Sequence, residues 1–220
     1  MITNKMVRNS VYFSLAVQII TSIVQIYGLF LVLPEKDSVL QDVLTLETIV
    51  QFIEAVFYSW LAYGIYQMKD VTPRRYYDWF LTTPTMLLAT VIYFKYLEGN
   101  HFTIGDFIKE NKINIIKLFG FNWLMLLFGY LGETNKMPLL ISVFIGFIFF
   151  ILSFYTIYSQ YVTTTEALYL FNFLFVVWGL YGVVAFLSTN LKNFLYNILD
   201  IISKNFYGLY IFYKILLISY

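Results

Sequence analysis

Long apolar stretches constrain this chain more than any other feature of its sequence. A segment of about 20 apolar residues is long enough to cross the hydrocarbon core of a bilayer as a helix. We expect such spans at residues 11–33, 45–68, 74–96, 113–131, 138–161, 168–187 and 194–218. The first is too long for a removed signal peptide and has no small-residue cleavage site, so we interpret it as a true span. The sequence therefore predicts an all-α membrane protein, a bundle of seven transmembrane helices in one domain over residues 1–220.

The composition excludes several other classes of protein. Of the residues, 60% are hydrophobic and 12% are charged, which is too little polar surface for a soluble domain of 220 residues. The net charge of +1 does not favour nucleic-acid binding, and the lack of cysteine excludes disulfides and thiolate metal sites. The single histidine, His101, lies in a polar stretch, so no histidine-based metal site or catalytic triad can form in the membrane. We expect a protein without a metal site that is not an enzyme. Lysine and arginine are divided almost evenly between the two sides of the predicted bundle, so they do not set its orientation.

Lys204 is a cation inside the last predicted span, in the segment LDIISKNFYGLYIFY. A lysine at the centre of a membrane helix costs roughly 2.5–3.5 kcal/mol on insertion scales, so an ionisable residue there is a functional hypothesis by default. Asp200 lies one turn earlier, on the same face of the helix. From this segment alone, two interpretations are equally open. The pair is a structural salt bridge, or Lys204 is a buried amine held ready for Schiff-base chemistry.

The third predicted span carries the most specific pattern. Residues 72–73, Thr-Pro, are typical of an N-cap followed by proline at the first helical position. In the following RRYYDWFLTTPTMLLA, Arg75, Asp78 and Thr82 share one face at the spacing i, i+3, i+7. This face carries a cation, an anion and a hydroxyl into the membrane, and Pro84 predicts a kink or a free carbonyl. By itself, the Arg–Asp pair also fits an ordinary interfacial ion pair at a helix start.

Two motifs of the chain resemble those of the microbial rhodopsins. The third helix of that family carries R-x-x-D-W-x-x-T-T-P, which here is Arg75, Asp78, Trp79, Thr82, Thr83 and Pro84. Its seventh helix carries D-x-x-x-K, which here is Asp200 and Lys204. The resemblance covers essentially the whole chain and implies all-trans-retinal bound to Lys204 as a covalent Schiff base, with Asp78 and Asp200 as counterions. It also implies that Arg75 lies outward of them and that the N-terminus is extracellular.

The resemblance extends to other side chains expected around retinal. Those that match the family's pocket are Tyr58, Trp79, Thr82, Thr83, Met86, Asn122, Met125, Gly129, Trp178 and Tyr181. For any one of them alone, ordinary packing is the favoured interpretation, because the chain is rich in aromatic residues. Three positions depart from the family pattern: Gly182 replaces a proline, Ala185 a tryptophan, and Ala89 the carboxylic acid that donates a proton in outward pumps. The last departure implies slow reprotonation and weak directional transport.

Polar residues recur along one face of three predicted spans. The first span carries Ser14, Gln18, Thr21 and Gln25, the second Glu47, Gln51, Glu54 and Tyr58, and the last Asn193, Asn197, Asp200 and Lys204, followed by Asn205. Carboxylates and amides that faced lipid would be costly, so these faces should meet inside the bundle. One such stripe alone indicates dry hydrogen bonding between helices. Three stripes on adjoining helices predict a hydrated ion path, and we assign these polar residues to it together with Asn205.

This pattern most resembles the group-1 rhodopsins of giant algal viruses, short seven-helix proteins described as light-gated cation channels. Glu54 matches the glutamate at the central gate of channelrhodopsins. We hypothesise a gate near Glu54, Asn197 and Tyr58 that opens in light to Na+, K+ and H+. Because carboxylates suit hard cations, we also expect calcium inhibition at Glu47 and Glu54. A light-driven proton pump, a sensory rhodopsin with a separate transducer and a retinal-free structural protein stay open as alternatives. For a viral protein we expect a multi-pass protein in a host cell membrane, as a homo-oligomer.

Overall fold

The computed structural model describes residues 2–64, 70–99 and 101–219, and this part of the chain is almost entirely helical. The long helices are α1 (Asn4–Leu29), α2 (Val39–Gly64), α3 (Thr72–Tyr96), α5 (Lys112–Glu133), α6 (Leu139–Tyr161) and α7 (Thr165–Val184). The last span is built from α8 (Thr189–Asp200), the π-helical segment η2 (Ile201–Asn205) and α9 (Phe206–Ile218). Two short helices, η1 (Glu35–Asp37) and α4 (Ile104–Glu110), lie in the connections. The predicted seven-helix membrane bundle is confirmed.

The predicted spans and the observed helices differ mainly at their ends. α1 begins at Asn4 rather than at residue 11, and α2 begins at Val39 rather than at residue 45. The expected end of the second span, Met68, lies outside the described residues. Hydropathy marks the apolar middle of a helix, whereas capping sets its end. At the start of α1, the hydroxyl of Thr3 accepts a hydrogen bond from the backbone N–H of Met6.

One connection contains a helix that the sequence analysis does not predict. We expect a polar turn over residues 97–112, but α4 occupies part of it. Thr103 caps this helix: its hydroxyl accepts a hydrogen bond from the N–H of Asp106 at 3.2 Å and donates one to the Asp106 carboxylate at 2.7 Å. A helix of seven residues is too short for its hydrophobic periodicity to stand out from a loop.

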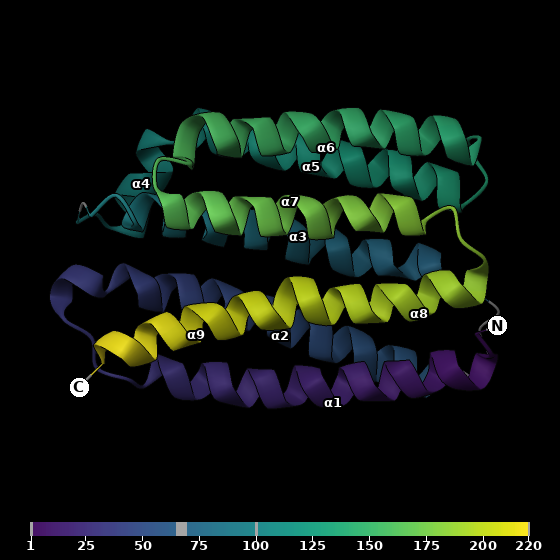
Figure 1. The fold of residues 1–220 in the computed structure, drawn as a ribbon, viewed down its shortest axis with the longest axis horizontal. Coiled ribbons are helices and arrows are strands. Elements are labelled where there is room, and N and C mark those ends of the chain that lie inside the picture. Colours follow the sequence, from purple (N-terminus) through teal and green to yellow (C-terminus); the bar gives the residue numbers. More distant parts are fainter. Residues whose placement is uncertain (1, 65–69, 100, 220) are drawn as a thin grey trace.

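The long helices form a closed ring. Neighbours in contact around it are α1 and α2, α2 and α3, α3 and α5, α5 and α6, α6 and α7, α7 and α8, and finally α8 and α1. In Figure 1, α1, α2 and the α8–α9 span lie on one side, α5 and α6 on the other, and α3 and α7 between them. The two chain ends lie at opposite ends of the long axis. The buried faces of α1, α2, α3 and the last span therefore surround a common interior.

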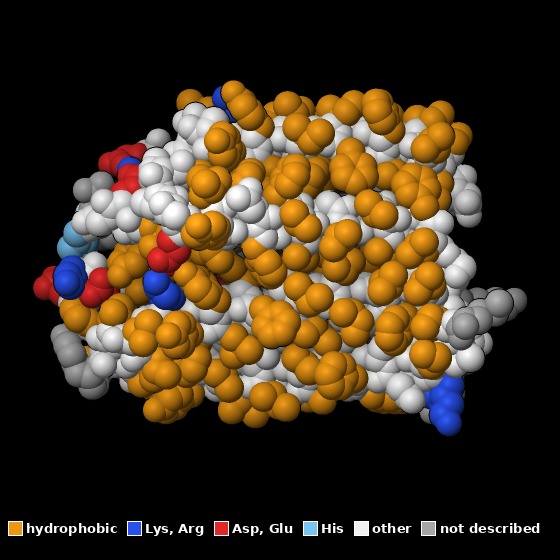
Figure 2. Space-filling view, viewed as in Figure 1, with side chains coloured by type: hydrophobic (Ala, Val, Ile, Leu, Met, Phe, Trp, Pro, Cys, Tyr) orange, Lys and Arg blue, Asp and Glu red, His pale blue; other side chains and the backbone are white. Residues whose placement is uncertain are grey.

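The exterior of the bundle is apolar, and its interior combines an apolar core with buried polar and charged side chains. Figure 2 shows apolar side chains over the whole flank, with most charged side chains gathered toward its left end. Polar and charged side chains buried inside include Gln18, Glu54, Arg75, Asp78, Asp200 and Lys204. By length and composition, α1, α5, α6, α7 and the α8–α9 span could each cross a membrane. Glu47 and Glu54 of α2 and Arg75 and Asp78 of α3 are buried, as expected of spans that line a site.

Pro84 interrupts the hydrogen bonding of α3 without ending the helix. Proline has no N–H, so the carbonyl of Phe80, four residues earlier, loses its helical donor. The indole Nε1 of Trp123 on α5 donates to this carbonyl at 3.1 Å, and the Trp123 ring stacks on Phe80 with centroids 5.2 Å apart. The free carbonyl predicted from Pro84 is thus used to join α3 to α5.

Candidate functional site

Lys204 lies in the π-helical segment in the middle of the last span. Here the N–H of Phe206 donates to the carbonyl of Ile201, five residues back instead of four. Such a turn accommodates one extra residue, and π turns inside α-helices are frequent at functional sites. Lys204 is buried, at 2% exposure. No pattern in the sequence of this span indicates the π segment.

Three carboxyl groups surround the ammonium of Lys204. Its Nζ lies 3.0 Å from Asp78 Oδ2 on α3 and 3.6 Å from Asp200 Oδ1 on α8, and it also pairs with Glu54 on α2. All four side chains are at most 3% exposed. The structure therefore brings the two motifs of the sequence together at one point, although they are more than 100 residues apart.

Glu54 lies in a place that the sequence analysis does not predict. We expect it in a gate with Asn197 and Tyr58, but its carboxyl contacts Lys204 and accepts a hydrogen bond from Gln18 Nε2 at 3.4 Å. Tyr58 instead donates to Asn197 Oδ1 at 3.1 Å, within a different cluster. The structure joins Tyr58 to Asn197 but gives Glu54 other partners, and the gate itself stays a prediction. Glu54 and Tyr58 are one helical turn apart, a rise of about 5.4–6 Å, which puts them at different levels of the bundle.

Arg75 ties α3 to the last span. Its Nη1 donates to Asp200 Oδ2 at 3.0 Å, and its other nitrogens donate to oxygen atoms of Asn193 and Asn197. Two tyrosine hydroxyls also donate to the Asp200 carboxylate: Tyr58 at 2.6 Å and Tyr181 at 2.9 Å. Arg75 and Asp200 are fully buried. A desolvated ion pair of this kind is tolerated when further hydrogen bonds satisfy its remaining donors and acceptors, as they do here.

The buried cluster holds two cations and three acids. The cations are Arg75 and Lys204, and the acids are Glu54, Asp78 and Asp200. An uncompensated charge in a low-dielectric interior is very costly, so the cluster is neutral when one acid holds a proton. Among the described residues, nothing donates to the second oxygen of Asp78, Oδ1. The cluster thus offers a movable proton beside the lysine nitrogen.

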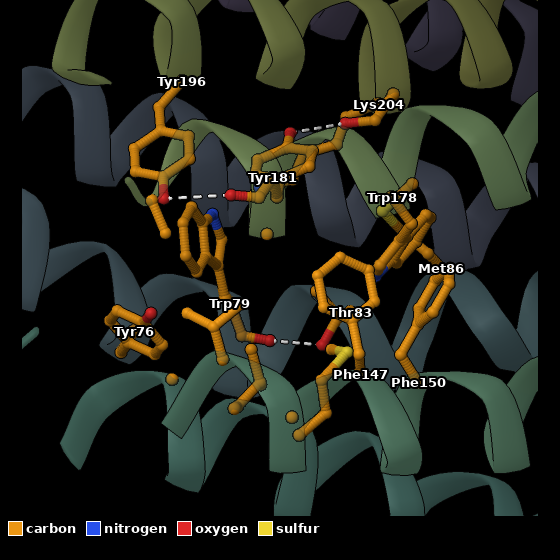
Figure 3. A pocket seen from close by; sticks show the side chains of 18 residues that line it. Tyr76, Trp79, Thr83, Met86, Phe147, Phe150, Trp178, Tyr181, Tyr196 and Lys204 are labelled. Atoms are coloured by element: carbon orange, nitrogen blue, oxygen red, sulfur yellow. Dashed lines mark hydrogen bonds between the residues drawn. The ribbon is translucent and has the colours of Figure 1, made fainter. Parts of the chain in front are cut away.

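An apolar pocket extends from Lys204 between α3, α5, α6 and α7 (Figure 3). The predicted pocket residues that line it are Trp79, Thr83, Met86, Met125, Gly129, Trp178 and Tyr181. Three others stand behind this lining rather than in it: Tyr58, Thr82 and Asn122. Thr82 donates to the backbone carbonyl of Asp78 at 3.0 Å, and Asn122 donates to the hydroxyl of Thr83 at 2.7 Å.

Several lining residues are absent from the sequence prediction. They are Tyr76, Leu126, Val143, Gly146, Phe147, Phe150, Gly182, Ala185, Tyr196 and Ser203. The contribution of α6 is missed because its sequence is a phenylalanine-rich apolar run without a motif. Gly182 and Ala185 are the positions that depart from the family pattern. A Cβ atom on Gly182 would lie 2.6 Å from the ring of Phe147, so this ring occupies the space that a larger residue at position 182 would need.

The polar faces of α1, α2 and the last span meet inside the bundle around Gln18. Its side-chain oxygen accepts hydrogen bonds from Gln51 and, at 3.0 Å, from Asn205. One turn away, Ser14 donates to the backbone carbonyl of Asn197 at 3.2 Å. At this level the side chains bond to one another directly, as in ordinary interhelical hydrogen bonding.

Beyond Gln18, toward the end of the bundle where α9 ends, the polar faces lose their partners. Within the described residues, the side-chain polar atoms of Gln25, Glu47 and Tyr207 are buried and make no hydrogen bond. Thr21 is buried at the same face of α1. Buried polar groups are nearly always satisfied, and water is the usual partner where protein atoms are not. This part of the interior therefore holds buried polar atoms that have no protein partner among the described residues.

Asp70 holds the opposite end of the site together. Its Oδ1 accepts hydrogen bonds from the backbone N–H of Thr72 at 2.9 Å, from the Thr72 hydroxyl at 2.7 Å and from Asn193 Nδ2 at 3.1 Å. Partial burial would raise the pKa of Asp70, but these hydrogen bonds outweigh it and bring the pKa below its ordinary value of 3.8. The same Asn193 contacts Arg75, so the exposed Asp70 is coupled to the buried cluster.

Replacing Asp70 with asparagine should destabilise the protein at neutral pH but not in strong acid. Because the pKa is lower in the folded state, the stabilisation is fully present above the ordinary value of 3.8 and is lost as the pH falls through the folded value. We expect the thermal unfolding midpoint of D70N to lie below that of the natural chain at about pH 7 and to converge with it below about pH 3. Equal midpoints at neutral pH would contradict this role.

The fold and this site define a class of membrane protein: a seven-helix bundle with a buried lysine at the head of an apolar, aromatic-lined pocket. The chain belongs to the bacteriorhodopsin-like family, because the family profile described as "Bacteriorhodopsin-like protein" matches residues 9–218. Proteins of this family bind retinal covalently through a lysine Schiff base, and retinal is the cofactor of this chain. The pocket fits such a group, since its lining is apolar along its length and Lys204 supplies an amine at one end.

Solved structures of microbial rhodopsins share this fold. The viral rhodopsin OLPVRII is similar with a TM-score of 0.88 and 27% identity, over 96% of this chain and 98% of that one. The blue light-absorbing proteorhodopsin from Med12 is similar with a TM-score of 0.76 and 20% identity, over 96% of each chain. The proton pumping rhodopsin AR2 from the marine alga Acetabularia acetabulum gives 0.75 and 20%, over 96% and 95%. No curated protein sequence matches the chain.

Proposed function

We propose that the protein is a light-gated channel for monovalent cations, with retinal attached to Lys204 and with Asp78 and Asp200 as counterions. The observation that carries the proposal is a run of buried polar side chains from one end of the bundle toward the other. Its members are Asn193, Arg75, Asp200, Lys204, Glu54, Gln18, Gln51, Asn205, Glu47 and Gln25. Acidic and amide side chains along a hydrated path favour cations over anions, so the expected ions are Na+, K+ and H+.

Bound retinal supplies the absorption of visible light and a change of shape when it isomerises. The chain supplies the control of one proton at the lysine nitrogen. A free lysine ammonium has three N–H donors, whereas the same nitrogen in a protonated Schiff base keeps one. Only one carboxyl can then accept from it directly. The two nearest acceptors, Asp78 and Glu54, come from different helices, so a small turn of the N–H selects between them.

Two hydrogen-bonded clusters close the path, one on each side of Lys204. The first consists of Arg75, Asp200, Tyr58 and Asn197, and the second of Glu54, Gln18, Gln51 and Asn205. Transfer of the proton from the Lys204 nitrogen to Asp78 or Glu54 neutralises one cation and one anion next to the two clusters. The remaining ion pairs are then weaker, because each was held by the summed field of its neighbours. Water joins the two halves, and cations follow their gradient.

Calcium inhibition follows from the same acids. Glu47 and Glu54 lie on one face of α2, and both are buried along the proposed path. Carboxylate oxygens are the ligands that hard cations prefer, so a calcium ion that enters the path is held longer than sodium. Calcium should therefore reduce the flux of monovalent cations.

Replacing Glu54 with glutamine tests the channel directly. The variant keeps the shape of the side chain but loses the negative charge beside Lys204, so we expect a several-fold change in photocurrent and an altered reversal potential in mixed cation solutions. The measurement is voltage-clamped photocurrent over a range of holding potentials, with the exposed Glu35→Gln as the matched control. In the natural chain the current should reverse sign near the cation equilibrium potential. An E54Q current equal to that of the control would remove Glu54 from the path.

A light-driven proton pump is the second candidate, and one observation favours it. The family's donor position on α3 is Ala89, but Glu47 on α2 is a buried acid whose oxygens have no partner among the described residues. A neutral carboxyl in that place could return a proton to the Lys204 nitrogen. The pump requires current of one sign at all holding potentials and acidification in light. In that case E47Q should slow recovery of the dark state, whereas in the channel it should mainly alter ion flux.

The proposed topology is a multi-pass protein with its N-terminus outside the cell. The resemblance supports this orientation, since the loop charges do not set one. The similar structure of a viral rhodopsin supports a viral origin and a host cell membrane as the location. A peptide tag on the N-terminus should be accessible to antibody in intact cells, and access only after permeabilisation would reverse the topology.

A further inference from the structure

We propose that retinal reaches its pocket sideways from the bilayer, between α6 and α7, past the side chain of Phe147. The proposal concerns uptake of the cofactor and rests on the proposed attachment to Lys204. Retinal is apolar and dissolves in the lipid, whereas the pocket lies in the middle of the bundle. An apolar molecule of that length must pass either through an end of the bundle or through its side.

Both ends of the bundle are closed by polar clusters. At one end, Arg75 is held by Asp200, Asn193 and Asn197. At the other end, the Glu166 carboxylate of α7 accepts hydrogen bonds from Tyr93 of α3 at 2.5 Å, from Tyr210 of α9, and from Lys214 at 3.1 Å. Passage of retinal through either end would separate charged partners and offer them no new hydrogen bonds, which is costly.

The seam between α6 and α7 has the opposite character. None of the hydrogen bonds among the described residues joins these two helices, which meet through aromatic rings. Toward Tyr161 the rings stack closely, as Phe150 does on Phe175 with centroids 5.0 Å apart. Toward the other end, small residues of the two helices line the pocket beside Phe147: Val143 of α6, and Gly182 and Ala185 at the end of α7. Opening this part of the seam exposes only apolar surface to lipid, which solvates it well.

Phe147 is the side chain that closes the seam. Its ring lines the pocket beside Phe150 and Trp178 (Figure 3). The ring also lies against Gly182, and Phe147 is partly exposed. The Phe147 side chain therefore lies between the pocket and the outside of the bundle. Rotation of a partly exposed side chain between rotamers breaks no hydrogen bond and is fast compared with the formation of an imine. Gly182 matters because it has no side chain. The Phe147 ring can therefore pack directly against its backbone and can rotate past it without a steric clash.

Uptake can be followed without any light-driven activity. Apoprotein in lipid nanodiscs is mixed with all-trans-retinal, and two signals are recorded: quenching of the fluorescence of Trp79 and Trp178, which line the pocket, and growth of visible absorbance. The first reports arrival in the pocket and the second reports attachment. The two proposals fail in different ways. If Lys204 is not the attachment site, K204A still forms pigment. The entry route between α6 and α7 is tested by the rate of quenching alone.

Phe147→Ala should speed the quenching phase by roughly tenfold, a barrier lowered by about 1.4 kcal/mol. Phe175→Ala, which lies farther along the same seam toward Tyr161, is the control for general loosening and should leave the rate unchanged. The smaller change Phe147→Leu repeats the test in case the alanine variant does not fold. Equal rates for the Phe147 variants and the natural chain would overturn the proposal, as would equal acceleration by F175A.

Closing the seam gives the converse test, and the chain suits it because it contains no cysteine. Phe144 on α6 and Val183 on α7 are 67% and 56% exposed and lie near the contact of Phe147 with Gly182. Both are changed to cysteine and bridged with a flexible bifunctional thiol reagent. We expect the bridge to slow quenching strongly in apoprotein, while the unbridged double variant takes up retinal normally. Unchanged uptake after complete bridging would show that retinal enters elsewhere.

Discussion

Replacing Lys204 with alanine should abolish the visible pigment entirely. In the described residues, Lys204 is the lysine that lines the apolar pocket, so no other amine is placed to form an imine with retinal there. The measurement is the absorption spectrum of the purified protein after incubation with all-trans-retinal. Lys214→Ala is the matched control, since Lys214 lies on the same span but pairs with Glu166 outside the pocket. The control should form pigment normally, and visible absorbance in K204A would contradict the assignment of the attachment site.

Replacing Asp200 with asparagine should destabilise the protein more than the same change at Asp78. Asp200 accepts from Arg75, Tyr58 and Tyr181, and the variant leaves Arg75 buried without a formal counter-charge. Breaking a buried ion pair by removing one partner costs about 3–5 kcal/mol. Asp78 pairs with Lys204. In D78N the Lys204 nitrogen keeps two acidic partners, Glu54 and Asp200, so this variant leaves no buried cation without a counter-charge.

The comparison of D200N with D78N makes this prediction specific. Both variants lose one carboxylate from the same cluster, so a difference between them reports Arg75 rather than the loss of an acid in general. Thermal unfolding of the pigment, followed by loss of visible absorbance, should show the lower midpoint for D200N. Both should shift the absorption maximum, since each removes a negative charge from beside the protonated nitrogen. Equal midpoints would mean that Asn193 and Asn197 suffice to hold Arg75.

The parts of the site that the sequence predicts are those for which the chemistry needs particular residue types at fixed spacing. A buried cation and anion on the last span, and an Arg–Asp–Thr face on the third, are improbable in lipid without a purpose, and the structure places them at one point. The seven spans can also be predicted from the sequence, because the thickness of the bilayer sets the number of consecutive apolar residues that a spanning helix needs. The helix ends were less accurate, since capping by residues such as Thr3 and Thr103 is local and weak in the sequence.

The rest depends on how the helices are turned and shifted against one another. The spacing along α2 predicts that Glu54 and Tyr58 face inward one turn apart, but not that Glu54 is level with Lys204 and Tyr58 with Asp200. The wall formed by α6 was missed for a similar reason: Phe147, Phe150 and Gly146 belong to an apolar helix in which any face could have been the inner one. Only the packed bundle determines these levels and faces.

The π segment at Ile201–Asn205 divides the last span into two rods, α8 and α9, whose side-chain faces are rotated relative to each other about the helix axis. Successive residues of a regular helix are about 100° apart, so one extra residue turns everything after it by that amount relative to everything before it. Asp200 and Asn197 belong to the first rod and Tyr210 and Lys214 to the second, which is how one span serves both the Arg75 cluster and the Glu166 cluster. Lys204 lies at the joint itself. A rotation of Lys204 therefore acts on two halves of the span that are aligned separately. Deletion of a single residue from the π segment would rotate α9 away from Glu166 and leave α8 in its present register.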